Sequence, residues 1–117
     1  MSSTRAGEIM EAMVAMFNTG DLSDVEAAVH TDYVDHQGLD GEPVQGVAGF
    51  ARVVFAARGR YQSLRVTIEA LIEESERVAA RLRWQGVRIS GEVVDRETLE
   101  IVRIEGGKAV EHWGGRS

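Results

Sequence analysis

The sequence contains no cysteine, which excludes disulfide bonds and thiolate metal sites. It contains one proline, Pro43, so little rigid loop structure is expected. Long hydrophobic runs are also missing, because Glu8 and Glu11 interrupt the methionine-rich N-terminal segment, which argues against a signal peptide and a membrane span. We therefore expect a cytoplasmic protein that has no membrane partner.

Basic residues are few compared with acidic ones. The sequence has 13 Lys and Arg against 19 Asp and Glu, which gives a net charge of −6. This acidic balance disfavours nucleic acids and anionic membranes as partners. The 117 residues, 44% of them hydrophobic, are sufficient for one core, and residues 1–117 are predicted to form a single domain.

The first half of the chain has the periodicity of helices. Apolar residues recur at helical spacing over residues 4–19, and Gly20 is a natural C-terminal stop. Ser23 and Glu26 have the spacing of a capping box, which predicts a short helix to about His30. The remaining predictions for this half are an extended segment over 33–36, a polar loop over 37–46 and a helix over 47–59.

The second half alternates between apolar and polar residues, as strands do. The apolar sets are Leu64, Val66, Ile68, Ala70 and Ile72, followed by Val78, Ala80, Leu82 and Trp84. If both sets share one face, Ile72 opposes Val78 and residues 74–76 form the loop. This register also predicts two cross-strand ion pairs on the other face, Glu69 with Arg81 and Glu73 with Arg77.

Residues 93–104 and 108–113 complete an antiparallel sheet of at least four strands. Helices followed by such a sheet predict an α+β domain, in which a sheet curled around the helices can enclose an apolar cavity. The outer sheet face is suited to pairing in a homodimer, although the arginines on it, Arg65, Arg81 and Arg83, could equally be solvated.

The register of the last hairpin decides which side chains meet. A three-residue loop with Gly107 in the left-handed conformation would pair Val102 with Val110 and Glu100 with His112. A carboxylate and an imidazole would then lie side by side on an otherwise apolar strand face.

A two-residue Gly106-Gly107 loop would instead place Ile101 opposite His112. We favour the three-residue loop because it also groups Arg103 with Glu111 on the opposite face.

Several short motifs follow one another along the chain. They are Asn18-Thr19-Gly20-Asp21, Tyr33-Val34-Asp35-His36, Val47-Ala48-Gly49-Phe50, Val66-Thr67-Ile68-Glu69, Glu76-Arg77-Val78-Ala79, Ile104-Glu105-Gly106-Gly107-Lys108 and Glu111-His112-Trp113. In this order they resemble the SnoaL-like polyketide cyclases, within the nuclear transport factor 2-like superfamily of cone-shaped α+β domains. The resemblance implies a curved antiparallel sheet wrapped around N-terminal helices, also described as a cystatin-like roll.

The resemblance further implies that His36, Glu100 and His112 face the cavity. Gly114 departs from the family pattern, in which an acidic general acid/base commonly follows the Glu-His-Trp motif. Because the superfamily hosts cyclases, isomerases, dehydratases and hydrolases, the fold alone does not identify a substrate.

The candidate catalytic residues are His112, Glu100 and His36. A carboxylate bonded to one imidazole nitrogen raises the basicity of the ring and leaves the other nitrogen to move a proton. Glu100 would thus orient His112, while His36 would polarise a carbonyl oxygen. A structural role is the alternative for all three, since Glu100 and His112 could merely satisfy each other and His36 could be a hydrogen-bonded strand residue.

Large apolar side chains are the candidates for holding a substrate, although each could equally be core. They are Trp84, Tyr33, Phe17, Met13, Phe50, Val102 and Val110. Because Tyr33 and His36 lie on opposite faces of a strand, only one of them can point into the cavity.

No metal and no cofactor is expected. His36, His112 and Glu100 could form a two-histidine, one-carboxylate site, but no paired histidine spacing supports it. The run Asp95-Arg96-Glu97 is interpreted as a solvated strand end, because three consecutive strand residues cannot all face one cavity.

Two functions follow from this pattern. The first is a cofactor-independent enzyme that performs cyclisation, isomerisation or dehydration on a hydrophobic, carbonyl-bearing small molecule such as a polyketide intermediate. The alternative, motivated by Gly114, is a non-catalytic module for ligand binding or dimerisation.

Overall fold

The computed structural model describes residues 5–116, and these form the predicted α+β domain. The helices are α1 (Ala6–Thr19), α2 (Val25–Ala28) and α3 (Gly46–Gly59). The strands are β1 (Val29–Leu39), β2 (Glu42–Gln45), β3 (Tyr61–Glu74), β4 (Arg77–Arg88), β5 (Val93–Glu105) and β6 (Lys108–Arg116). Within residues 5–116, no helix has the length and hydrophobicity needed to cross a bilayer.

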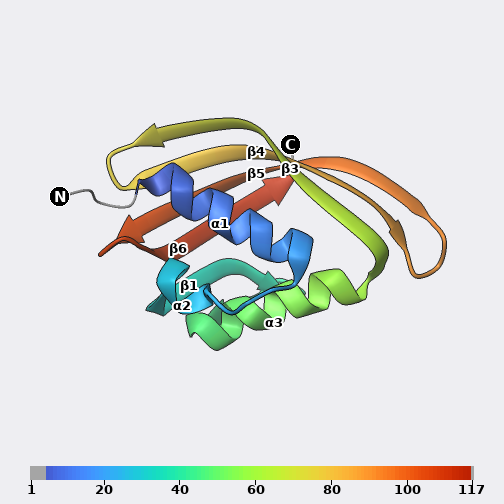
Figure 1. The fold of residues 1–117 in the computed structure, drawn as a ribbon, viewed down its shortest axis with the longest axis horizontal. Helices are drawn as coiled ribbons and strands as arrows, with labels where there is room; N and C mark the ends of the chain where they lie inside the picture. Colours follow the sequence, from blue (N-terminus) through green and yellow to red (C-terminus); the bar gives the residue numbers. More distant parts are fainter. Residues whose placement is uncertain (1–4, 117) are drawn as a thin grey trace.

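The six strands form one curved sheet in the order β2-β1-β6-β5-β4-β3. Figure 1 shows α1 lying across the sheet and α3 running beside β1. Neighbouring strands are antiparallel except β1 and β6, which are parallel. The prediction of an antiparallel sheet is therefore wrong for one pair of neighbouring strands, β1 and β6.

The predicted polar loop over 37–46 is wrong. Residues 37–39 continue β1, and a turn through Asp40 and Gly41 leads into β2, which pairs back onto β1. Gly41 has a φ of 82° and Asp40 a φ of 53°, both in the left-handed region that tight hairpin turns require. Polar residues on a short edge strand resemble a loop in sequence, which explains the error.

Helix α1 is fixed to the sheet through its C-terminal end. Gly20 ends the helix with a φ of 74°, as predicted, and its N–H donates to the carbonyl of Met16. The Asn18 amide donates to the carbonyl of Val66 at 2.8 Å and accepts from the Val66 N–H at 2.7 Å. These two bonds join the C-terminal end of α1 to β3.

The predicted capping box is absent. The residue before α2 is Asp24, which makes no side-chain cap, and the Ser23 N–H instead donates to Asp21 Oδ1 at 2.9 Å. This local turn competes with the cap for Ser23. The helix itself spans only four residues, because the chain enters β1 at Val29.

A β-bulge in β3 changes the predicted register near the β3–β4 turn. Val66 opposes Trp84, but Ile72 opposes Ala79 instead of Val78, because the register shifts between Ile68 and Ala70. Ile72 therefore points outward and is 71% exposed, and Leu71 packs against the core in its place.

Both predicted ion pairs of this hairpin are wrong for the same reason. Arg83 lies between Glu69, at 3.9 Å, and Asp95 on the next strand, at 2.8 Å. Glu73 pairs with Arg5 at 3.1 Å.

The favoured register of the β5–β6 hairpin is also wrong, as is the alternative. The turn is the two-residue Gly106-Gly107 loop, but a bulge at Val110 then shifts the strands, so that Val102 opposes His112 and Arg103 opposes Glu111. Glu100 opposes Gly114 and is thus a diagonal neighbour of His112 on the same face. The homodimer through the outer face stays a prediction.

Matched substitutions test the bulge in β3. Ile72→Thr is expected to change the free energy of unfolding by no more than about 0.5 kcal/mol, because the side chain is already in solvent. Val66→Thr buries a hydroxyl at a position that is 3% exposed, and is expected to cost about 1–3 kcal/mol. Urea unfolding followed by circular dichroism measures both; similar losses would show that Ile72 faces the core after all.

Candidate active site

A cavity of about 350 Å³ lies between the helices and the concave face of the sheet. Its apolar wall includes six of the side chains assigned to substrate from the sequence: Met13, Phe17, Tyr33, Phe50, Trp84 and Val102. Phe17 packs edge-on against Phe50 and Trp84, with ring centroids 5.9 and 5.5 Å apart. The Trp84 N–H donates to Thr98 Oγ1 at 2.8 Å, so the polar atom of this aromatic wall is satisfied.

Val110 does not line the cavity, contrary to the prediction. It is the extra residue of the β6 bulge and has no partner in the β5–β6 register. Its side chain is buried elsewhere, and His112 takes the place opposite Val102 that the sequence analysis gave to Val110.

The inner end of the cavity is polar and is built from three strands. His112 on β6 lies between Asp35 on β1 and Glu100 on β5. The Nδ1–Asp35 Oδ1 distance is 2.9 Å, and the Nε2–Glu100 Oε1 distance is 2.5 Å. The parallel pairing of β1 with β6 places Asp35 opposite His112, so this pairing brings the trio of Asp35, His112 and Glu100 together.

The electrostatics favour a protonated His112. Burial alone would lower the pKa of His112, but the hydrogen bonds to Asp35 and Glu100 outweigh burial and raise this pKa to about 9. Burial likewise opposes ionisation of Asp35, yet the bonds from His112 and from the backbone N–H groups of Gly38 and Gln37 hold the Asp35 pKa below its usual range. Near neutral pH, His112 is thus an imidazolium that donates to two carboxylates.

This arrangement corrects the predicted dyad. Glu100 and His112 are in contact, but neither ring nitrogen of His112 is free, because Asp35 occupies the second one. A free imidazole nitrogen facing the substrate is therefore not present. Among the described residues, Glu100 accepts only at Oε1, which leaves Oε2 as the unengaged oxygen of the trio beside the cavity.

Asp35 is the site residue that sequence reasoning missed. Its Oδ1 also accepts from the N–H groups of Gln37 and Gly38 at 3.0 and 2.9 Å, while the Tyr33 hydroxyl lies 3.4 Å from Oδ2. Tyr33 and Asp35 alternate along β1, so an inward Tyr33 implied an inward Asp35. The sequence signal was present, but the partner that selects this face, β6, could not be identified from sequence.

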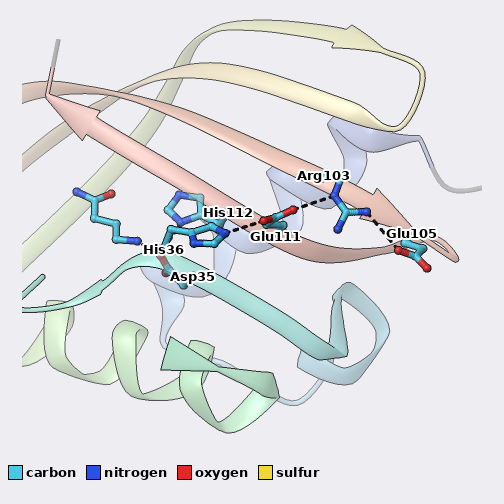
Figure 2. Close-up of polar contacts among 7 residues, drawn as sticks. Asp35, His36, Arg103, Glu105, Glu111 and His112 are labelled. Carbon is cyan, nitrogen blue, oxygen red and sulfur yellow. Dashed lines mark hydrogen bonds and ion pairs between the residues drawn. The ribbon is translucent and has the colours of Figure 1, made fainter. Parts of the chain in front are cut away.

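His36 points away from the cavity, and the expectation that it faces inward is wrong. It lies 2.6 Å from Glu111 Oε2 and stacks on Trp113 with ring centroids 5.2 Å apart. Figure 2 shows this polar row on the outer face continuing from Glu111 to Arg103 and Glu105. Because His36 and His112 lie on opposite faces, the two-histidine metal site does not come together.

The described residues hold no group of three or more His, Asp or Glu side chains placed to bind a metal ion. In the trio itself, both nitrogens of His112 are committed to carboxylates.

Neighbouring side chains fill the space that a side chain at position 114 would need. A Cβ at this position would lie 2.5 Å from Glu100 Oε1 and would also collide with Gln37 Oε1. The carboxylate of Glu100 thus fills the space beside Gly114, its cross-strand partner. A side chain at 114 and the observed position of Glu100 exclude each other.

The other end of the cavity is cationic. Arg60, Arg88 and Arg96 all contribute to its lining. The interpretation of Asp95-Arg96-Glu97 as a solvated strand end is therefore wrong for Arg96: its two acidic neighbours ion-pair on the outer face, with Arg83 and Arg81, while Arg96 points inward.

The sequence profile of the SnoaL-like polyketide cyclases matches residues 7–115. The chain belongs to this family. Among curated proteins, none is similar enough to count as a match.

Solved structures share the fold of this SnoaL-like chain. IdmH of Streptomyces antibioticus, a proposed polyketide cyclase, is 21% identical with a TM-score of 0.81, over 94% of this chain and 90% of that one. A proposed polyketide cyclase of Bacillus cereus is 23% identical with a TM-score of 0.84, over 96% and 74%. AclR of Streptomyces galilaeus, a proposed hydroxylase, is 22% identical with a TM-score of 0.77, also over 96% and 74%. The predicted nuclear transport factor 2-like fold is confirmed.

The trio makes stability depend on pH in a defined window. The pKa of His112 is raised from 6.5 to about 9 on folding, so its stabilising contribution is complete below pH 6.5 and is lost as pH rises through about 9. The free energy of unfolding should therefore fall over this range in the wild type. In His112→Gln this fall should be missing, so the difference in free energy of unfolding between the two proteins should become smaller as pH rises. A difference that stays constant over this pH range would contradict the raised pKa of His112.

Two glycine substitutions test the packing at Gly114. In Gly114→Ala the new Cβ displaces the flexible ends of Glu100 and Gln37, which should cost little stability but weaken the Glu100–His112 contact. The titration midpoint of His112, followed by ¹H NMR of the ring, should then move down from about 9. Gly115→Ala is the control, because a Cβ there meets nothing within 4 Å and the midpoint should not change.

Proposed function

We propose that this SnoaL-like protein is a small enzyme that catalyses proton transfer on a hydrophobic, carbonyl-bearing molecule such as a polyketide intermediate. The observation that carries the proposal is the Asp35–His112–Glu100 trio at the closed end of an apolar cavity. Titratable groups that converge in such a pocket are the expected signature of an acid/base site.

Glu100 is the group assigned to meet the substrate in this proposal. Its Oε2 removes a proton from the carbon next to the carbonyl, and the protonated carboxyl then returns the proton to another atom of the substrate. Isomerisation, ring closure and dehydration all use this pair of steps. Because the proton leaves carbon and returns without a change of oxidation state, the reaction needs no redox cofactor.

His112 and Asp35 act on Glu100 and not on the substrate. The imidazolium fixes the orientation of the Glu100 carboxylate, and Asp35, held by two backbone N–H groups, fixes the imidazolium. Glu100 thereby takes the role of the acidic residue that commonly follows the Glu-His-Trp motif in the family and that Gly114 replaces in this chain. This division of roles replaces the arrangement in which His112 would be the base.

Hydrogen exchange on a simple aromatic ketone tests the proposal. With 2-tetralone in D₂O at neutral pH, the wild type should speed the loss of the C1 proton signal in ¹H NMR above the buffer rate. Glu100→Gln should reduce this acceleration by at least about a hundredfold, since general bases contribute roughly 10²–10⁴ in rate.

Glu69→Gln is the matched control, because it makes the same chemical change on an exposed position of β3 outside the cavity. It should leave the exchange rate unaltered. Ketone that binds without faster exchange would contradict the proposal and would favour the non-catalytic binding module.

A further inference from the structure

The cavity has opposite charges at its two ends. Asp35 and Glu100 lie at the inner end, and only one imidazolium offsets them. Three guanidinium groups, those of Arg60, Arg88 and Arg96, lie toward the other end. This concentration of positive charge stands out in a chain of net charge −6.

Arg96 points inward because of the strand pattern of β5. Glu100 and Thr98 are buried on the concave face, and Arg96 is the next residue of that series. Cross-strand pairing places Arg96 opposite Trp84, the aromatic wall of the cavity. About 13 Å of strand separates the Cα atoms of Arg96 and Glu100, four residues at about 3.3 Å each.

Within residues 5–116, Arg96 has no acidic partner for its charge. Its Nε is buried and makes no hydrogen bond to these residues, and none of their ion pairs includes Arg96. The acidic residues on either side of it point to the opposite face, where they pair with other arginines. Arg96 is half-buried, so its guanidinium on the cavity wall is available to bind an anionic group carried by a ligand.

The neighbouring arginines are already engaged, but they add to the same positive field. Arg88 Nε lies 3.0 Å from Glu92 Oε1, an ion pair without hydrogen-bond geometry, and its guanidinium lies over the Tyr61 ring, 5.9 Å from the centroid. Arg60 pairs with Asp40 at 3.4 Å. Both side chains are more than 40% exposed, which marks this end as the mouth of the cavity.

We propose that Arg96, supported by Arg88 and Arg60, binds a carboxylate carried by the ligand, so that the substrate is an aromatic or polycyclic keto acid with its carboxylate at the mouth. A planar guanidinium matches a carboxylate with two parallel hydrogen bonds. The carboxylate at Arg96 directs the opposite, uncharged end of the molecule toward Glu100. The placement of a reacting carbonyl at that end rests on the proposed function; the carboxylate site itself does not.

A pair of probes that differ only in charge tests the carboxylate site. 2-Naphthylacetate and its methyl ester are titrated into the protein by isothermal calorimetry at low salt. The wild type should bind the carboxylate at least tenfold more tightly than the ester, and the preference should shrink as salt is added.

Arg96→Gln should remove this preference while leaving the affinity for the ester unchanged. Arg88→Gln should reduce it by a smaller factor, because that guanidinium is shared with Glu92. Arg65→Gln is the matched control: it removes the same charge from an exposed position of β3 outside the cavity, and should keep the preference intact.

Three results would overturn the carboxylate site: equal binding of acid and ester by the wild type, binding of neither probe, or a preference that survives in both Arg96→Gln and Arg88→Gln. The titration requires no turnover, so it separates this inference from the proposed function. A preference for the carboxylate without ketone exchange would support the carboxylate site and contradict the proposed enzymatic function. Ketone exchange that depends on Glu100, without the preference, would support the enzymatic function and contradict the carboxylate site.

Discussion

The chain of hydrogen bonds from Asp35 through His112 to Glu100 is the constraint on which the rest of the site depends. Two carboxylates and an imidazole are buried together, and taking such charges out of water is costly unless each is compensated. Compensation here comes from short contacts at both ring nitrogens and from two backbone N–H groups on Asp35. Removing His112 would leave two carboxylates without a cation, and removing either carboxylate would leave one ring nitrogen without an acceptor, so the three residues act as a unit.

Irregular features of the sheet bring these three residues together. Parallel pairing of β1 with β6 brings Asp35 to His112, and the bulge at Val110 turns His112 onto the concave face beside Glu100. Gly114 leaves the space that the Glu100 carboxylate fills. The apolar wall and the arginine-lined mouth then complete a cavity that is anionic at its closed end and cationic at its open end.

Periodicity and glycine positions predicted helices over 4–19 and 47–59, close to the observed 6–19 and 46–59, with residue 4 outside the described residues. They also predicted the positions of the later hairpins and the α+β class. The contact between Glu100 and His112 was also predicted, although from an incorrect register. What could not be predicted depends on long-range pairing or on one-residue insertions. The β-bulge before Ile72 and the one at Val110 change the sheet face to which the side chains beyond them point, and no local sequence pattern predicts these bulges. The inward direction of Asp35 in place of His36 likewise depends on β6, which lies more than 70 residues away in the chain.

The ¹⁵N NMR spectrum of the His112 ring shows whether an imidazolium lies between Asp35 and Glu100. At pH 7, Nδ1 and Nε2 should both resonate in the range of protonated imidazole nitrogens, each coupled to a slowly exchanging proton. A neutral ring, with one nitrogen at the shift of an unprotonated acceptor, would show that the two carboxylates do not hold an imidazolium between them.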